Sequence, residues 1–459
     1  MRKLMFGFGR RLIDPPFPMG LAGYFNTRMW SGVLDSIEVR CCVMKQDDIT
    51  AVIVQFELIT VTPELHQAVQ AVTRKHLSDF VMISTATHCH TAPELRIGRG
   101  GYDENYVPFA VAAYEKALLQ AVRSLSECRS IQSGQAFSMD FCFNRRFWMK
   151  DGTVVTNPPK CSPDIVRPEG EIDPEIPLIL LESVHGKLLF ASISNHADTT
   201  GGTEISGDWP ARTAHEMEKV LGPGSMCIPL IGCSGNINHF DIHDPGEQAS
   251  PREAGRIGCG YAAGIVKGLK NLREEPLTLG QARRKFHIGS RELFPEELAE
   301  AQEILRKYPA EDTAGSSAPL TARDFAEKSP KVLRYFAENL IKVAEDEKEF
   351  DFEVSAVSLG NALLVGLPAE PFVEIGLEIR KEIFTENTQV LCAIMNNGSG
   401  SGYIPNLWNY RRGGYENTPR SNPYSIHAAA ELKKICGELK EDLKKGNDPP
   451  LTTRKVPAP

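Results

Sequence analysis

The sequence predicts an α/β fold in which a central mixed sheet is flanked by helices and an active site lies at the carboxyl ends of the strands. Short apolar segments of strand length alternate with segments of helical periodicity through most of the 459 residues, as is typical of α/β proteins. Four of the apolar segments change abruptly to small and polar residues before the next helix begins. Ligands of open α/β sheets bind beyond the carboxyl ends of strands, so these four polar segments are expected to meet at one edge of the sheet.

The individual elements follow from the apolar patterning, taken in chain order. Strands are expected at residues 37–44, 50–56, 80–83, 176–182, 188–194, 226–231, 352–357, 362–367 and 390–395. Helices are expected at residues 64–75, 108–125, 255–271 and 428–444. Pro63 suits the first position of the first helix, and the His185-Gly186 turn between two of the strands predicts a β-hairpin.

Two stretches depart from the simple alternation. Residues 142–174 are irregular, and because long irregular segments inside a compact domain are often functional, we expect this one to form part of a cavity wall. Residues 285–350 predict a helical insertion whose second helix has Ser329 as its N-cap and Pro330 at its first position. The apolar stripes of the insertion are expected to be core or subunit-facing surfaces, which is compatible with a homo-oligomer. Residues 446–459 are expected to form a C-terminal tail.

Composition and charge argue against several classes of protein. A formal net charge of −8, without a concentrated basic stripe, argues against a nucleic-acid partner. No run approaches about 18 consecutive apolar residues, so no membrane span is expected, and glycines and Arg10-Arg11 interrupt the apolar run that a signal peptide would need. The eleven cysteines are odd in number and show no CxxC spacing, which favours reduced thiols in a cytoplasmic protein.

The first polar segment contains two histidines, His88 and His90, after the apolar run that ends at Ile83. In a strand, residues i and i+2 point to the same side, so the two imidazoles would face one cavity and could together hold a metal ion. A surface turn that happens to contain two histidines would give the same pattern. The pair alone does not separate these interpretations.

Three later segments favour the metal site. The second polar segment contains His196 and continues to Asp208, which is expected to N-cap the next helix; the third spans residues 232–239; the fourth contains Glu370. Histidines and a glutamate are the usual ligands of a hydrolytic zinc ion, which keeps one position open for water. A histidine satisfied inside the core and a glutamate favoured by a helix N-terminus are the alternative interpretations.

Five motifs in order resemble those of the neutral ceramidases. Thr87-His88-Cys89-His90-Thr91-Ala92-Pro93 is similar to the Thr-His-Thr-His-Ser-Gly-Pro loop of that family, and Ser206-Gly207-Asp208 and Pro368-Ala369-Glu370 are similar to its Ser-Gly-Asp and Pro-Gly-Glu. Gly402-Tyr403 and Tyr415-Glu416 repeat its Gly-Tyr and Tyr-Glu pairs at the same interval of 12 residues (415 − 403 = 12), and Ala22-Gly23-Tyr24 resembles the start of its catalytic domain. The similarity spans roughly residues 6–420, and it implies a single ceramidase-like catalytic domain over residues 1–445.

The resemblance also implies the roles of the site residues. It implies a Zn²⁺ ion with four protein ligands, His88, His196, Glu370 and Tyr403. A phenol is a poor ligand, but a nearby dication favours the phenolate. His90 and Tyr415 would then be catalytic groups that donate hydrogen bonds to the oxyanion developing on the cleaved carbonyl.

The sequence departs from the family at its catalytic serine. Asn238 stands where that serine would be, within the segment 235–240, and an amide cannot replace a hydroxyl nucleophile. Zinc-activated water is therefore expected to be the nucleophile, with Asn238 as a catalytic residue that orients the substrate. Ser234 lies four positions earlier and is not assumed to substitute.

Two further features bear on the site and its substrate. His239, Asp241 and His243 lie just beyond Asn238 and are candidates for a base or a second metal site. The chain ends soon after the catalytic region, without the C-terminal immunoglobulin-like domain of the family, and together with the expected cytoplasmic location this argues against ceramide as the substrate.

A small polar molecule is the expected substrate, with Arg96, Asn195 and Arg420 as the residues that bind it. Arginines are concentrated in loops near the motif segments, and several of them could bind a carboxylate or phosphate group. They are Arg96, Arg99, Arg145, Arg146, Arg411, Arg412 and Arg420.

Three functions are compatible with these residues. The first is a zinc-dependent hydrolase that cleaves an amide, ester or lactone bond. The second is a metal-dependent lyase or isomerase acting on a sugar-acid-like substrate, in which zinc stabilises an enolate and a histidine moves a proton. The third is a non-catalytic zinc-binding module, but structural zinc is normally closed by four Cys or His ligands, and the expected set contains Glu and Tyr.

Overall fold

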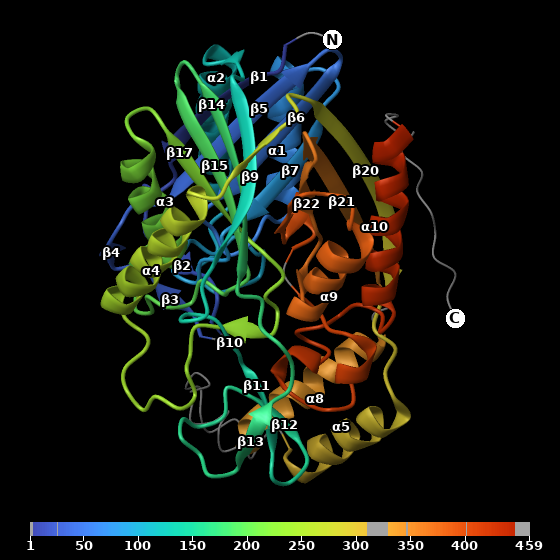
Figure 1. Ribbon diagram of the computed structural model, residues 1–459. Coiled ribbons are helices and arrows are strands. Elements are labelled where there is room, and N and C mark those ends of the chain that lie inside the picture. The colour runs from blue at the N-terminus through green and yellow to red at the C-terminus, as the bar shows by residue number, and fades with distance from the viewer. Residues whose placement is uncertain (1–2, 25, 310–328, 346–347, 401, 446–459) are drawn as a thin grey trace.

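Three mixed β-sheets form the body of the protein. The computed structural model describes residues 3–24, 26–309, 329–345, 348–400 and 402–445. The first sheet has the order β7-β6-β5-β1-β8, the second β17-β15-β14-β9-β19 and the third β20-β21-β22-β24. Figure 1 shows these sheets in the upper part of the molecule, with the small strands β10–β13 and helices α5 and α8 below them.

The strands of these sheets have the following bounds. The first sheet contains β1 (Met5–Leu12), β5 (Glu38–Gln46), β6 (Ile49–Phe56), β7 (Val81–Ala86) and β8 (Ser126–Glu127). The second contains β9 (Ser130–Phe137), β14 (Glu175–Ser183), β15 (Gly186–Ile193), β17 (Met226–Ile231) and β19 (Arg273–Glu275). The third contains β20 (Leu279–Gly289), β21 (Glu349–Leu359), β22 (Ala362–Gly366) and β24 (Val390–Ala393).

Helices cover the outer faces of the sheets. Helices α1 (Pro63–His76) and α2 (Tyr106–Arg123) belong to the first sheet, α3 (Asp208–Leu221) and α4 (Pro251–Leu269) to the second, and α10 (Ala428–Lys445) packs on the third. Helices α5 (Pro295–Lys307) and α8 (Pro330–Glu345) pack on each other, and α9 (Val373–Glu378) continues into a π-helical turn, Ile379–Ile383.

Alternate residues of the strands enter two different cores. Ile53 of β6, Phe190 of β15 and Leu364 of β22 belong to one buried apolar cluster that unites all three sheets. Their neighbours Val52 and Leu189 belong to a second cluster that includes the apolar faces of the helices. Because successive side chains of a strand point to opposite faces, each of these sheets is buried on both sides. This explains why the strands are continuous apolar runs in the sequence.

The edge strands β7, β17 and β24 bring the three sheets together. Each of them pairs in parallel with its neighbour in its own sheet. Beyond β24, Ile394 donates its backbone N–H to the Ile231 carbonyl (2.9 Å) and accepts a hydrogen bond from the Thr85 hydroxyl (2.7 Å). The carboxyl ends of strands from three sheets therefore converge at one place, and the loops that follow them carry the predicted site.

Short strands and turns build the surroundings of this place. The irregular segment forms β10 (Phe143–Asn144), β11 (Arg146–Met149), β12 (Val154–Thr156) and β13 (Ile165–Pro168). The remaining short strands are β2 (Gly20–Leu21), β3 (Arg28–Met29), β4 (Gly32–Val33), β16 (Glu204–Ile205), β18 (Ile237–Asn238), β23 (Glu370–Pro371) and β25 (Tyr403–Ile404). Turns of 3₁₀-helix lie at Asn396–Gly398, Leu407–Asn409 and Tyr415–Asn417.

The predicted fold class is confirmed: the protein is α/β, with mixed sheet flanked by helices. The strands are distributed over three sheets instead of one central sheet, and the three sheets share one buried apolar cluster. The helical insertion is shorter than predicted, since residues 285–289 continue β20 and residues 349–350 begin β21. Its second helix does begin as expected, with Val332 donating its N–H to the Ser329 hydroxyl (3.4 Å).

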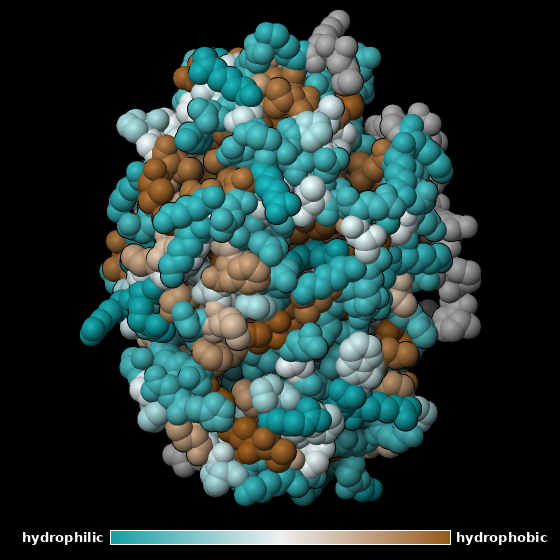
Figure 2. All heavy atoms as spheres, viewed as in Figure 1, coloured by the Kyte–Doolittle hydropathy of each residue, from teal (hydrophilic) through white to brown (hydrophobic). Residues whose placement is uncertain are grey.

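The surface, the helices and the cysteines can be compared with the expectations of no membrane span and of reduced thiols. Figure 2 shows a face made mainly of hydrophilic residues, with hydrophobic residues in small separated groups. Among the described helices, none is both long and apolar enough to cross a membrane. All eleven cysteines are free, in agreement with the prediction of reduced thiols. The cytoplasmic location, the homo-oligomer and the boundaries of the catalytic domain stay predictions, and residues 446–459 lie outside the described part of the chain.

Candidate metal centre

His88 lies two residues beyond β7, at a sharp turn of the backbone. Its φ of 59° is in the left-handed region, which is uncommon for a residue with a side chain. The imidazole Nδ1 lies 2.8 Å from the Ile59 carbonyl oxygen. A carbonyl can only accept, so Nδ1 carries the proton and Nε2 presents a lone pair, which is the arrangement typical of a metal-binding histidine.

His196 and His90 complete a group of three imidazoles. The ring of His88 lies 4.6 Å from that of His196 and 4.9 Å from that of His90, measured between centroids. Potential ligand atoms of the three residues all lie within 4.8 Å of one another, and no other such cluster of His, Cys, Asp or Glu occurs in the part of the chain that was described. The ring nitrogens of His90 and His196 are buried and have no hydrogen-bond partner there.

Glu370 brings a carboxylate to the same point. Its Oε2 atom lies 3.2 Å from Nε2 of His88 and 3.5 Å from Nε2 of His196, and it receives no hydrogen bond. Ligand bonds of about 2.0–2.1 Å in a tetrahedral zinc site place neighbouring ligand atoms about 3.4 Å apart. Buried nitrogen and oxygen atoms without partners at this spacing fit a zinc ion.

The electrostatic environment favours the ligand form of the histidines. Burial is the main cause that lowers the pKa of His90 and His196 well below the usual value, and neighbouring basic groups, including His88, lower it further. Both rings are therefore neutral at pH 7. A neutral imidazole has the free lone pair that metal binding requires.

Tyr403 lies beside Glu370 because β23 and β25 pair in parallel, with Glu370 opposite Tyr403. Its ring is 6.4 Å from that of His196 and 5.8 Å from that of Tyr415. Burial raises the pKa of the Tyr403 phenol well above the usual value, while the Arg145 guanidinium opposes this shift. The Arg145 carbon Cζ lies 5.2 Å from the centre of the Tyr403 ring.

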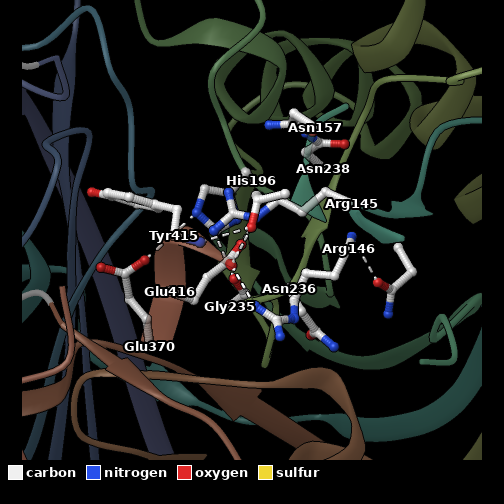
Figure 3. A network of polar contacts seen from close by, with 12 residues as sticks. Arg145, Arg146, Asn157, His196, Gly235, Asn236, Asn238, Glu370, Tyr415 and Glu416 are labelled. Atoms are coloured by element: carbon white, nitrogen blue, oxygen red, sulfur yellow. Dashed lines mark hydrogen bonds and ion pairs between the residues drawn. The ribbon is translucent and has the colours of Figure 1, made fainter. Parts of the chain in front are cut away.

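A buried ion network fixes the segment that carries Tyr415 (Figure 3). The carboxylate of Glu416 is fully buried and accepts hydrogen bonds from Arg145 Nε (2.8 Å), Arg146 Nη1 (2.8 Å) and the Thr156 hydroxyl (2.6 Å). Burial raises the pKa of Glu416, but the two guanidiniums outweigh it and the net shift is downward. Arg145 and Arg146 were expected only as loop arginines that could bind a substrate anion, because neither can be matched to Glu416 before the fold is known.

A cavity of about 360 Å³ lies in front of the candidate metal centre. Its lining is polar, and Ile59 is its one aliphatic side chain. The other lining residues are Gly23, Tyr24, His88, His90, Arg96, Arg99, Arg145, Thr156, Asn157, Asp198, Glu370, Gly402, Tyr403, Tyr415, Arg420 and Ser421. The predicted substrate-binding residues Arg96 and Arg420 are among them, and His196 lies directly behind the wall that His88 and Glu370 form.

Asp198 lies beside His90 at the cavity wall. Its Oδ2 atom is 3.6 Å from His90 Nδ1, too far for a hydrogen bond, and its Oδ1 atom accepts one from the Tyr24 hydroxyl (2.6 Å). Burial is the main cause that raises the pKa of Asp198 above the usual range. The carboxylate is thus oriented by Tyr24, a residue that sequence reasoning used only as part of a motif.

Several predicted residues lie elsewhere. Asn238 is not in the cavity wall: its Nδ2 donates to the Asn157 side-chain oxygen (2.8 Å), and Asn157 is the residue that faces the cavity (Figure 3). Asn195 is buried behind the wall, where its Nδ2 donates to the Phe141 carbonyl (2.7 Å) and lies 3.0 Å from the Tyr261 hydroxyl. Neither Asn238 nor Asn195 lines the cavity, and the roles predicted for them toward the substrate stay predictions.

The predicted N-cap and second site also differ from the structure. Asp208 is the first residue of α3, and Gly207 is the N-cap. Oδ2 of Asp208 accepts from the backbone N–H groups of Thr199 and Thr200 (2.8 and 2.7 Å), which holds the loop after His196, and its Oδ1 accepts from the Trp209 N–H (2.6 Å) in the first turn of the helix. His239 is held by the Gln248 carbonyl (2.7 Å). It does not cluster with Asp241 and His243, so no second metal group forms among the described residues.

No family model and no curated protein matches the sequence. The fold is similar to that of neutral ceramidase from Pseudomonas aeruginosa, with a TM-score of 0.72 and 15% identity over 100% of this chain and 76% of that one. It is also similar to a structure described as ceramidase complexed with C2, with a TM-score of 0.72 and 16% identity over 99% of this chain and 77% of that one.

Proposed function

We propose that this protein is a zinc-dependent hydrolase that cleaves an amide, ester or lactone bond of a small polar substrate. One observation carries the proposal: Nε2 of His88 and the unpartnered atoms Nε2 of His196 and Oε2 of Glu370 meet at metal-ligand spacing beside a polar cavity. The likeness in fold to two ceramidases over nearly the whole chain supports a hydrolase, and it supports residues 1–445 as one catalytic domain.

Tyr403 is our candidate for the fourth ligand, and His90 is the alternative. Tyr403 is paired directly with Glu370 across β23 and β25, and Arg145 beside its ring would stabilise a phenolate. His90 has two unpartnered ring nitrogens near those of the other two histidines. The zinc content of the Tyr403→Phe and His90→Ala proteins shows which residue is the fourth ligand, because only the loss of a ligand should lower the zinc content strongly.

The chain's own residues would prepare the cleaved carbonyl. When bound, zinc would polarise that carbonyl and lower the pKa of a water molecule towards about 7, which makes water the nucleophile. His90 and Tyr415 face the same cavity and would donate hydrogen bonds to the developing oxyanion. Ser234 is fully buried and is not part of the cavity wall, which supports water over a serine as the nucleophile.

The second candidate keeps the metal and changes the reaction. His90 is neutral and its ring nitrogens have no partner, so it could move a proton in a lyase or isomerase that acts on a sugar-acid-like substrate. A non-catalytic zinc module is disfavoured, because the ligand set opens onto a cavity instead of being closed by Cys and His.

Two measurements test the proposal. Elemental analysis of the purified protein should find about one zinc ion per chain, and its removal should abolish cleavage of N-acyl compounds and lactones. Turnover in oxygen-18 water should place the label in the product, since only hydrolysis requires this. Activity without label incorporation would transfer the assignment to the lyase or isomerase, and a protein without bound metal would refute both.

A further inference from the structure

Three arginines gather at one end of the cavity. Arg96, Arg99 and Arg420 line it together, and the charges of Arg99 and Arg96 act with burial to lower the pKa of Arg420. Glu94 is paired with Arg96. Guanidiniums that line one end of a cavity can bind the oxygens of an anionic group there.

Glu94 holds Arg96 in a fixed orientation. It is buried, with 4% exposure, and accepts from Arg96 Nε (2.7 Å) and Nη2 (2.6 Å) in a two-point contact. The opposite edge of the guanidinium keeps its N–H donors for another partner. A guanidinium held in this way can bind a planar or tetrahedral oxyanion with little loss of side-chain freedom.

Arg99 and Arg420 are also placed by their surroundings. The Arg99 backbone N–H donates to the Arg96 carbonyl (3.1 Å), and the loop is anchored where Gly20 donates to the Gly101 carbonyl (2.7 Å). The Arg99 side chain is exposed and forms no ion pair with any described residue. Arg420 stacks on Tyr335 of α8, with Cζ 4.9 Å from the ring centre, so the insertion supports this end of the cavity.

The other carboxylates of the cavity wall are engaged elsewhere. Asp198 accepts a hydrogen bond from Tyr24, and Glu370 lies against His88 and His196. The volume of about 360 Å³ corresponds to about a dozen water molecules at about 30 Å³ each, so a small substrate suits it. With a single aliphatic residue in the lining, charged and polar groups and three tyrosine rings are the groups available to bind a substrate.

We propose that the substrate carries an oxyanion, a carboxylate or a phosphate group, which Arg96, Arg99 and Arg420 bind while the scissile bond lies against His88 and Glu370. This inference rests on the proposed function for the use of the cavity as a substrate site. It adds the chemical class of the substrate: a small anionic ester, amide or lactone.

Binding of simple anions tests the site independently of turnover. Glutarate and inorganic phosphate are titrated calorimetrically into the zinc-loaded protein and into its Arg99→Gln and Arg420→Gln variants. We expect at least one probe to bind, each variant to bind it roughly 10- to 100-fold more weakly, and binding to weaken with added salt. Preference for glutarate or for phosphate identifies the group as a carboxylate or a phosphate.

Arg411→Gln is the matched control. Arg411 lies in the same stretch of chain and stacks on Phe294 (4.4 Å), but it is not part of the cavity wall. The Arg411→Gln substitution removes the same charge from the protein and should leave the affinities for glutarate and phosphate unchanged. Equal loss in this variant, no loss in the two test variants, or no binding of either probe would overturn the anion site.

A pair of substrates separates this inference from the proposed function. Glutaryl p-nitroanilide and pentanoyl p-nitroanilide differ in one carboxylate, and we expect the anionic one to have a KM roughly 10-fold lower or better, an advantage lost in Arg99→Gln. Equal cleavage of the two by a zinc-containing protein would refute the anion site alone. Arginine-dependent binding of the anions by a protein without metal or hydrolysis would refute the proposed function alone.

Discussion

Replacing Glu416 by glutamine should destabilise the protein by about 3 kcal/mol. The carboxylate is fully buried, with one oxygen accepting from Arg145 Nε and the other from Arg146 Nη1 and the Thr156 hydroxyl. A glutamine side chain has one acceptor oxygen and one donor group, so either orientation places an N–H against a guanidinium. Three charge-assisted hydrogen bonds that each lose about 1 kcal/mol give the total, at the lower end of the range for a broken buried ion pair.

The expected change in melting temperature follows from chain length. An unfolding entropy of about 2.1 cal/mol/K per residue over 459 residues is about 1 kcal/mol/K, so the melting temperature should fall by about 3 °C in scanning calorimetry. The matched control is Glu338→Gln, which breaks the half-exposed pair with Arg334 (2.7 Å) and should cost less than about 1 kcal/mol. Equal stability of the Glu416→Gln protein and the parent would refute the network.

Three further predictions concern the metal, the oxyanion and pH. His88→Ala and Glu370→Ala should each lose zinc and activity in elemental analysis and turnover assays, and a fully active metal-free variant would contradict the mechanism. Tyr415→Phe should keep the metal and slow kcat roughly 100-fold, as for one lost oxyanion donor; an unchanged kcat would remove Tyr415 from the reaction. Burial lowers the pKa of His66 to about 4, below the unfolded value of about 6.5, so the unfolded state binds more protons in this window and stability falls as pH drops through it, by up to about 3 kcal/mol. In urea unfolding, the free energy of unfolding should differ less between pH 7 and pH 4 for His66→Gln than for the parent protein. An equal difference in the two proteins would refute the contribution assigned to His66.

The fold was predictable because the strands are buried on both faces. Runs such as residues 226–231 are continuously apolar, and their bounds in the structure match the prediction. The division into three sheets was not predictable, because the same apolar run suits packing against a helix or against another sheet. That choice depends on which strands become neighbours, and β17 pairs with β15 but also contacts β24, which is distant in the chain.

The rings of His88 and His90 face one cavity, as predicted, but for a different reason from the strand periodicity that was used to predict it. The spacing of His88 and His90 suggested two rings on one side of a strand, but β7 ends at Ala86 and His88 has a left-handed backbone. The rings become neighbours because a turn and the bridge between Cys89 and Ala197 bring them together. The spacing in the sequence was enough to group His88 with His90, but the positions of their rings depend on tertiary contacts.

Asn238 shows why the rest of the site could not be read from spacing. Its motif position indicated a side chain facing the substrate, but β18 pairs with β10, where Asn238 lies opposite Phe143. This pairing directs the amide to Asn157, which no local pattern singles out. Arg145 is a similar case, since a loop arginine gives no sign in the sequence that it will be buried against Glu416.

Because three edge strands converge at the proposed metal centre, metal binding there would report complete folding. His88 follows a strand of the first sheet, His196 one of the second and Glu370 one of the third, so the ligand set exists only after all three sheets have docked. Zinc affinity would then be coupled to the stability of the whole chain, and a bound zinc ion would hold together parts that fold from sequence-distant segments. A chain missing any one sheet would keep apolar surface exposed and would lack a site for the ion.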